Sequence, residues 1–313
     1  DPGAIRQLVA RLSSDDPCVR RTAAKMLGNS TITDEALGAL LDDPSARVRE
    51  AVLMAIGNDE RPALRTRAER MLQSDDVALV TMAAWALGEL EDHGSVEPLQ
   101  AILDHSSPRV RMTAAWALGE IEDAHAVRKL LPLLHDRETG VRWAAAGALG
   151  NIEDVEAAPA LEQLLGNEPD REVRLQAIEA LGNIEAARSA APLARVIAGN
   201  DPELALAAAR AIGNLDDLEH APPELVRAAS SPDPDMRRAV VSALSSIEDP
   251  GTVSALLPLL TDPDPDIRRD VIEALGDMNA QQAKPGITRA LNDKMPEVRK
   301  AAVEALAELE DES

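Results

Sequence analysis

The sequence contains no phenylalanine and no tyrosine, and tryptophan occurs only three times among 313 residues. A single compact core of this length normally uses aromatic side chains to fill its volume. Because 45% of the residues are nonetheless apolar, alanine, leucine, valine and isoleucine must do the packing. The composition therefore favours thin layers of closely packed helices over one large globular core.

Cysteine is nearly absent as well, since Cys18 stands alone and excludes an intrachain disulfide. This fits a reducing compartment. No apolar run approaches the about 18 residues that a membrane-spanning helix needs, and no signal-like segment opens the chain. We therefore expect a cytoplasmic protein with no membrane partner. A trimmed N-terminus stays open, because the first residue is Asp1.

Lysine is scarce, and acidic residues outnumber basic ones by 55 to 32, which gives a net charge of -23. A field of this sign repels nucleic acid and anionic membranes, so we expect neither as a partner. The same balance is typical of proteins from a salt-rich, halophilic cytoplasm, and an ordinary acidic protein is the alternative.

What the chain does contain is a repeat. The stretch MAAWALGELED at residues 82–92 returns as TAAWALGEIED at residues 113–123. Aligned on the glycine of this phrase, ten copies follow one another at spacings of 29–32 residues, with serine and alanine at that slot in two of them. The glycine slot is occupied by Gly28, Gly57, Gly88, Gly119, Gly150, Gly182, Gly213, Ser245, Gly276 and Ala307.

Within each copy the apolar residues fall at helical spacing on one broad face. A shorter apolar segment, such as Thr252–Leu260, precedes each of these helices, and turns rich in aspartate and proline separate the two. One helix pair cannot bury its apolar face alone, whereas stacked pairs can. The sequence therefore predicts an all-α solenoid of about ten helix pairs that spans residues 1–313 without separate domains.

The repeated V-R-x-x-A-x-x-A-L-G-x-I segment, as at Val110–Asp123 and Val141–Asp154, resembles the HEAT repeat. It is most similar to the short type named after phycobilisome lyases. The resemblance implies that the second helix of each pair lines the concave side of the solenoid. It leaves function open, because the family includes scaffolds, adaptors and chromophore lyases.

Two slots have a predicted structural role. The glycine slot is interpreted as a close-packing point inside a helix, so we expect Gly119→Ala to be tolerated and Gly119→Leu to be strongly destabilising. The slot eight residues earlier is predicted to form a ladder with acids in the turns, such as Asp43, Asp136, Asp262 and Asp293; ligand binding is the alternative. Its arginines are Arg20, Arg49, Arg111, Arg142, Arg174, Arg237, Arg268 and Arg299.

The exposed face of the second helix carries the slots seven and three residues before the glycine and one after it. These slots are charged in the last copies, for example Arg238, Arg269 and Lys300, but apolar in the middle ones. Exposed aromatic and methionine side chains are typical of binding surfaces, and burial against neighbouring helices is the alternative. The predicted partner-binding residues are Met54, Trp85, Met112, Trp116, Trp143, Leu175 and Leu206.

Signals of catalysis are missing. The five histidines show no metal-ligand spacing, no cysteine cluster exists, and the glycines are spread one per copy instead of forming a phosphate cradle. We therefore predict no catalytic residue, no metal and no cofactor, and a scaffold or adaptor without enzymatic activity that binds a protein partner. Handling of a chromophore or another apolar small molecule is the competing hypothesis.

A further departure from the repeat lies at residues 61–70, where Arg61, Arg65, Arg67 and Arg70 form a basic stretch on an acidic chain. It is interpreted either as a receptor for an acidic partner or as a solvated face paired with nearby acids.

Overall fold

The computed structural model describes residues 2–58, 60–247 and 249–311. Over these residues it consists of 20 α-helices with short 3-10 segments and no strand. The predicted all-α architecture of helix pairs is thus confirmed. The chain divides into two compact units, residues 1–164 and 165–313. Each unit is described by itself, and a single solenoid over the whole chain stays a prediction.

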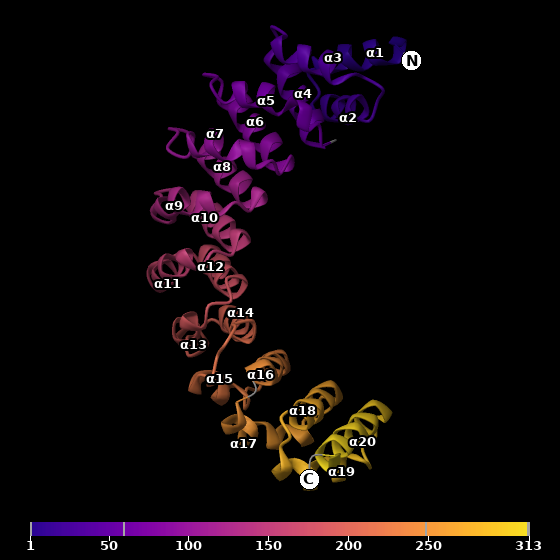
Figure 1. The fold of residues 1–313 in the computed structure, drawn as a ribbon, viewed down its shortest axis with the longest axis vertical. Helices are drawn as coiled ribbons and strands as arrows, with labels where there is room; N and C mark the ends of the chain where they lie inside the picture. Colours follow the sequence, from indigo (N-terminus) through magenta and orange to yellow (C-terminus); the bar gives the residue numbers. More distant parts are fainter. Residues whose placement is uncertain (1, 59, 248, 312–313) are drawn as a thin grey trace. The chain divides into compact units, whose positions relative to one another are not determined.

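In each repeat a first helix, here the A helix, is followed by a second, the B helix. In the first unit every B helix packs against the B helix of the next repeat, which gives a row from α2 to α10 (Figure 1). The A helices are α1 (Pro2–Leu12), α3 (Asp34–Ala39), α5 (Arg65–Met71), α7 (Val96–Gln100) and α9 (Val127–Leu130). The B helices are α2 (Pro17–Gly28), α4 (Ala46–Asn58), α6 (Val77–Glu89), α8 (Pro108–Ile121) and α10 (Thr139–Ile152).

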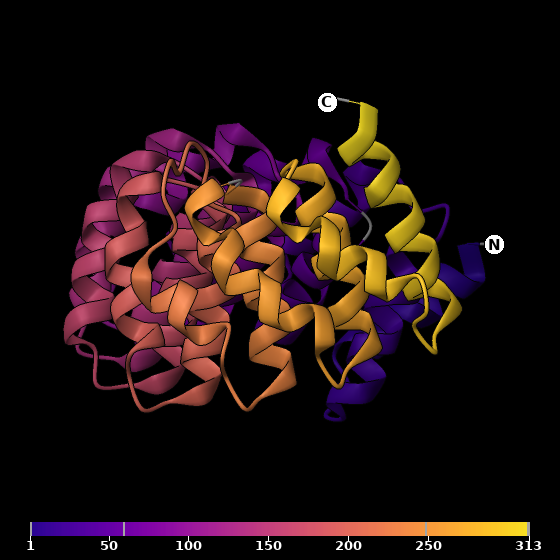
Figure 2. The same cartoon turned by 90° about the horizontal axis from the view of Figure 1, so that it is seen from below.

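The second unit repeats this arrangement, with its B helices packed in order from α12 to α20. The orange to yellow part of Figure 2 shows the last of them side by side. Its A helices are α13 (Ala190–Ile197), α15 (Pro223–Ala228), α17 (Val253–Leu256) and α19 (Lys284–Ala290). Its B helices are α12 (Arg171–Asn183), α14 (Pro202–Gly213), α16 (Pro234–Ile247), α18 (Pro265–Asp277) and α20 (Pro296–Asp311). The division between the units falls within α11 (Ala158–Asn167).

The A helices are shorter than the sequence pattern indicates. The chain does not form one helix over Thr252–Leu260; it forms α17 between two 3-10 segments, and Pro258 lies in the second of them. Proline cannot donate the backbone hydrogen bond that a continuing α-helix needs. The 3-10 segments are η1 (Leu40–Asp42), η2 (Pro62–Leu64), η3 (His93–Ser95), η4 (Ala124–Ala126), η5 (Leu131–His135), η6 (Val155–Ala157), η7 (Ala187–Ser189), η8 (Pro250–Thr252), η9 (Leu257–Thr261) and η10 (Gln281–Ala283).

Aspartates cap several B helices, among them α2 and α6, whereas α8 and α10 have no side-chain cap. Asp16 accepts a hydrogen bond from the backbone N–H of Cys18 at 2.8 Å, and Asp76 accepts one from Ala78 at 3.0 Å. Such caps satisfy amide groups that have no partner within the helix. Where such a cap is present, it fixes the start of the B helix and therefore the register of the slots on its exposed face.

The glycine slot lies inside the B helices, and no described glycine has a positive φ. An ideal Cβ on Gly88 would lie 2.8 Å from Cα of Ala117, and one on Gly119 would lie 2.7 Å from Cα of Ala148. Close packing is therefore the role of the slot, but the expected tolerance of Gly119→Ala is wrong. The neighbouring backbone stands closer than a methyl group allows, whereas Ala307 is exposed on α20.

Candidate functional site

Five of the predicted partner-binding residues lie on consecutive B helices of the first unit. Met54 is on α4, Trp85 on α6, Met112 and Trp116 on α8, and Trp143 on α10. Because these helices pack in this order, the five side chains form one row, which we call the indole row. Trp143 exposes 46% of its surface and Met112 37%, whereas the other three are half-buried.

The two half-buried indoles cover the glycine slot of the preceding repeat. Ring atom Cζ3 of Trp85 lies 2.8 Å from an ideal Cβ on Gly57, and Cζ3 of Trp116 lies 2.9 Å from one on Gly88. Each ring therefore packs on the neighbouring helix and stays partly open to solvent. One part of each ring is buried between helices, and the other part is exposed as a binding surface would require.

Met112 connects this row to the next helix. Its Sδ lies 3.3 Å from an ideal Cβ on Gly140, and Gly140 precedes Trp143 by one turn of α10. The most exposed members of the row, Met112 and Trp143, therefore share one patch across α8 and α10.

Carboxylates follow the indoles along the same helices. Glu89 lies one turn after Trp85 on α6, and Glu120 lies one turn after Trp116 on α8. Residues four apart share a helix face, so each of these indoles has a carboxylate beside it. Both glutamates are half-buried, and among the described residues neither makes an ion pair.

Two further glutamates, Glu91 and Glu122, follow α6 and α8 in the left-handed backbone region, with φ of 49° and 55°. This conformation costs roughly 1 kcal/mol for a residue with a Cβ, and glycine is usual at this position. They were not predicted as site residues; their signal is the Glu-Asp dipeptide that follows these helices without a glycine. We call Glu89, Glu91, Glu120 and Glu122 the acidic edge.

The four carboxylates of the acidic edge interact with one another. Burial raises the pKa of Glu120, and the charges of Glu89, Glu91 and Glu122 raise it further. Negative charge is also unfavourable at a helix C-terminus. The chain thus holds unpaired carboxylates beside its indoles where several effects disfavour them.

The other two predicted residues belong to the second unit. Leu175 on α12 and Leu206 on α14 are half-buried and lie on helices that pack together. The predicted partner-binding residues therefore lie as a group of five in the first unit and a pair in the second.

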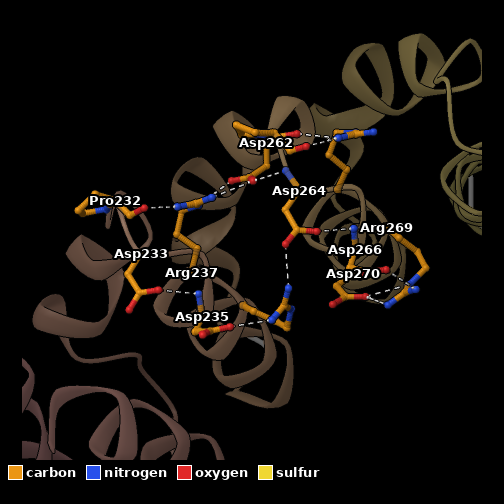
Figure 3. A network of polar contacts seen from close by, with 12 residues as sticks. Pro232, Asp233, Asp235, Arg237, Asp262, Asp264, Asp266, Arg269 and Asp270 are labelled. Carbon is orange, nitrogen blue, oxygen red and sulfur yellow. Dashed lines mark hydrogen bonds and ion pairs between the residues drawn. The ribbon is translucent and has the colours of Figure 1, made fainter. Parts of the chain in front are cut away.

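Met112 occupies the slot seven residues before the glycine slot. On α16 and α18 of the second unit, this slot holds arginines that form ion pairs. Arg238 on α16 donates to Asp264 at 2.8 Å, and Arg269 on α18 donates to Asp270 at 2.6 Å. In Figure 3 Arg269 lies beside Asp270, and Asp264 is the acceptor of the other pair. The charges of these two arginines are paired within the chain, whereas the indole row offers exposed apolar surface at equivalent positions.

The ladder arginines bind the turn that precedes their own helix. Seven of the eight donate from Nη1 to the backbone carbonyl six residues earlier, at 2.7–2.9 Å. Among the described residues Arg174 does not make this bond. The seven are Arg20, Arg49, Arg111, Arg142, Arg237, Arg268 and Arg299.

Three of these arginines also form two-pronged ion pairs with the next repeat. Their N–O distances are 2.7–3.0 Å, in Arg111–Asp136, Arg237–Asp262 and Arg268–Asp293. Asp43, another predicted acid of the ladder, is not paired with Arg20, which binds the carbonyls of Ser14 and Asp15. The contacts support a structural role for the ladder.

The protein is expected to lose stability as the pH falls below about 4, the range of an ordinary aspartate. The backbone and ring of His125 lower the pKa of Asp123 to about 2, and the guanidinium of Arg268 lowers the pKa of Asp293. A carboxylate with a lowered folded pKa stabilises the fold above its unfolded pKa, and this contribution is lost as the pH falls through the folded value. Thermal melts from about pH 5 to about pH 2 measure the loss. Asp123→Asn should flatten the curve, and an equally steep fall in that variant would contradict the assignment.

Two of the four arginines of the basic stretch at residues 61–70 are paired with acids. Arg61 pairs with Asp34 at 2.8 Å, and Arg65 pairs with Glu69 at 2.5 Å. These pairs support the interpretation as a solvated face and provide no open receptor for an acidic partner at these two arginines.

No group of three or more histidine, cysteine, aspartate or glutamate side chains is placed to hold a metal ion in residues 2–58, 60–247 and 249–311. His93 and His125 both lie beside Asp123, at 3.0 and 2.7 Å. Within the described helices, none is long and apolar enough to cross a bilayer.

Two solved structures illustrate what the chain is similar to. The crystal structure of an engineered protein from the Northeast Structural Genomics Consortium matches at 22% identity with a TM-score of 0.63, over 98% of both chains. The complex of CpcE and CpcF of phycocyanin lyase from Nostoc sp. PCC7120 matches at 23% identity with a TM-score of 0.45, over 79% of this chain and 94% of that one.

The second of these structures corrects one expectation. We predicted a protein without enzymatic activity, but a structure of the same helical-repeat kind is that of a lyase complex. Membership in this fold therefore does not exclude catalysis, and the prediction is withdrawn. At this TM-score the likeness assigns no activity to the chain.

A comparison with curated protein sequences gives no match. The family model for HEAT repeats matches residues 33–107, 96–182, 189–269 and 253–313, which cover most of the sequence. The resemblance that the repeated V-R and A-L-G slots indicate is thereby confirmed. The chain belongs to the HEAT-repeat family.

Proposed function

We propose that the protein binds a segment of a protein partner over the indole row of its first unit. The observation that carries the proposal is the exposure of Trp143 and Met112, 46% and 37%, on adjacent helices. Equivalent positions on α16 and α18 hold ion pairs formed within the chain. Exposed tryptophan and methionine side chains in one patch are typical of binding surfaces.

The form of the row favours an elongated partner. It runs across α4, α6, α8 and α10, one or two side chains per helix. An amphipathic helix places apolar anchors at regular intervals and suits such a row. The neighbouring unpaired carboxylates would repel a carboxylate-rich pigment, which disfavours the competing hypothesis of chromophore handling.

The double variant Trp143→Ser/Met112→Ser is expected to weaken partner binding roughly 30-fold, because it removes one central anchor contribution of about 2 kcal/mol. Peptides selected from a random helical library on the immobilised wild-type chain serve as partners. Titration of each selected peptide against both proteins measures the loss. These two side chains are chosen because Trp85 and Trp116 also pack on the glycine slots.

The matched control is Val303→Ser on α20, an exposed apolar residue of the second unit. It should leave the affinity of the selected peptides unchanged, and circular dichroism should show that all variants keep their helices. Peptides that bind the double variant as tightly as the wild type would overturn the proposal. A library that yields no binder would overturn it as well.

A further inference from the structure

The acidic edge has no partner within the described chain. Glu91 and Glu122 are exposed, and Glu89 and Glu120 are half-buried, yet none of the four makes an ion pair among the described residues. Neighbouring aspartates behave differently: Asp92 pairs with Arg65 at 3.4 Å and Asp123 lies 3.0 Å from His93. Other acids, such as Glu153 and Glu185, also make no ion pair among the described residues. What distinguishes the four glutamates is that they adjoin the indoles.

Three physical effects disfavour carboxylates at these positions. The like charges repel one another, the helix C-terminus is a negative end, and the left-handed backbone of Glu91 and Glu122 suits glycine better. A cation supplied from outside would offset the first two effects at once. A positively charged group bound beside the acidic edge would therefore stabilise these carboxylates.

The indoles add a second attraction for the same group. Glu89 and Glu120 each lie one helical turn after a tryptophan, on the same face. A lysine or arginine held by either carboxylate is thus placed near an indole, and the face of an indole attracts a cation. Carboxylate and indole together prefer a basic side chain over a neutral one.

We propose that the partner segment is an amphipathic helix that lays apolar side chains on the indole row and lysine or arginine side chains on the acidic edge. The inference rests on the proposed function and specifies the chemistry of the partner. It commits to a protein segment of net positive charge, which a chain of net charge -23 also attracts over longer distances.

The test uses two synthetic helical peptides that share one apolar face and contain no tryptophan or tyrosine. One carries lysine along the flank of this face, and the other carries glutamine at the same positions. The chain has three tryptophans and no tyrosine, and all three belong to the indole row, so its fluorescence reports on this surface alone. The lysine peptide should shift the emission to shorter wavelength and bind at least about ten-fold more tightly than the glutamine peptide.

The double variant Glu91→Gly/Glu122→Gly removes two carboxylates and relieves two left-handed residues, so it keeps the fold. It should weaken the lysine peptide roughly ten-fold and leave the glutamine peptide unchanged. The matched control is Glu185→Gly/Asp217→Gly in the second unit, where φ is 57° and 51°. The control removes the same charge and should leave both affinities unchanged.

The outcomes separate the two proposals. Equal binding of the lysine and glutamine peptides at the indole row overturns the basic partner and leaves the proposed function standing. Equal weakening by the control variant shows attraction by net charge alone and also overturns it. Failure of both peptides to change the emission overturns the basic partner, and a library that yields no binder overturns the proposed function itself.

Discussion

Gly119→Leu is expected to be among the most destabilising single substitutions in the first unit, lowering the free energy of unfolding by about 3 kcal/mol or more. An added Cβ already lies 2.7 Å from Cα of Ala148 and 2.9 Å from its Cβ, so a larger side chain must push α8 and α10 apart. Gly119→Ala should cost about 1–2 kcal/mol for the same reason. Urea unfolding followed by tryptophan fluorescence measures both, since all three indoles lie in this unit.

Gly166 provides the matched control. It lies in α11, and no atom stands within 4 Å of an added Cβ. Gly166→Ala should therefore raise the free energy of unfolding by about 0.5–1 kcal/mol, since alanine restricts the unfolded chain and favours the helix. If Gly119→Ala proved as harmless as Gly166→Ala, the close approach of α8 and α10 would be refuted.

Arg237→Ala is expected to lower the free energy of unfolding by roughly 3 kcal/mol, the lower end of the range for breaking a buried ion pair. The side chains of Arg237 and Asp262 are 12% and 3% exposed, and two N–O contacts of 2.7 and 3.0 Å join them. Without the guanidinium, the carboxylate of Asp262 stays buried with its charge uncompensated. The variant also loses the hydrogen bonds to the carbonyls of Ser231 and Pro232 in the turn before α16, of which Figure 3 shows the one to Pro232.

The double variant Arg237→Ala/Asp262→Ala should recover part of this loss, because the unpaired charge is gone. As a control, Arg47→Ala removes an ion pair to Asp15 in which both side chains are more than half exposed. Pairs of this kind contribute little, so its unfolding curve, recorded by circular dichroism, should stay close to that of the wild type. Similar losses for Arg237→Ala and Arg47→Ala would contradict the importance of burial in the ladder.

The sequence determined the class of fold because the same pattern of apolar, arginine and glycine slots occurs ten times. The aliphatic, arginine and glycine slots recur at 29–32 residues, and their helical spacing leaves one broad apolar face that only a neighbouring copy can cover. The start of several B helices was readable for a local reason, since an aspartate such as Asp76 caps the amide group two residues away. The slots of the indole row follow directly from this register.

The acidic edge was not predicted as a site. Whether a glutamate lacks an ion pair depends on its neighbours in space, and the sequence pattern does not show them. Glu91 and Asp92 are adjacent in the sequence, yet Asp92 reaches Arg65 of the preceding repeat while Glu91 has no ion pair among the described residues. Which acid forms an ion pair depends on where the basic groups of the adjacent repeat lie. The left-handed backbone of Glu122 is likewise visible only in three dimensions, since sequence preference alone favours glycine there.

By itself the sequence determined the repeat, the helical architecture, the family and the register that aligns Trp85, Trp116 and Trp143. Only the tertiary structure decided how far each indole is exposed, that Gly119 has no room for a methyl group, and which carboxylates lack a counter-charge. The physical reason is range: helix periodicity and capping act within a few residues of the chain. Exposure, close approach and pairing, by contrast, are set by distances of a few ångströms between helices about 30 residues apart.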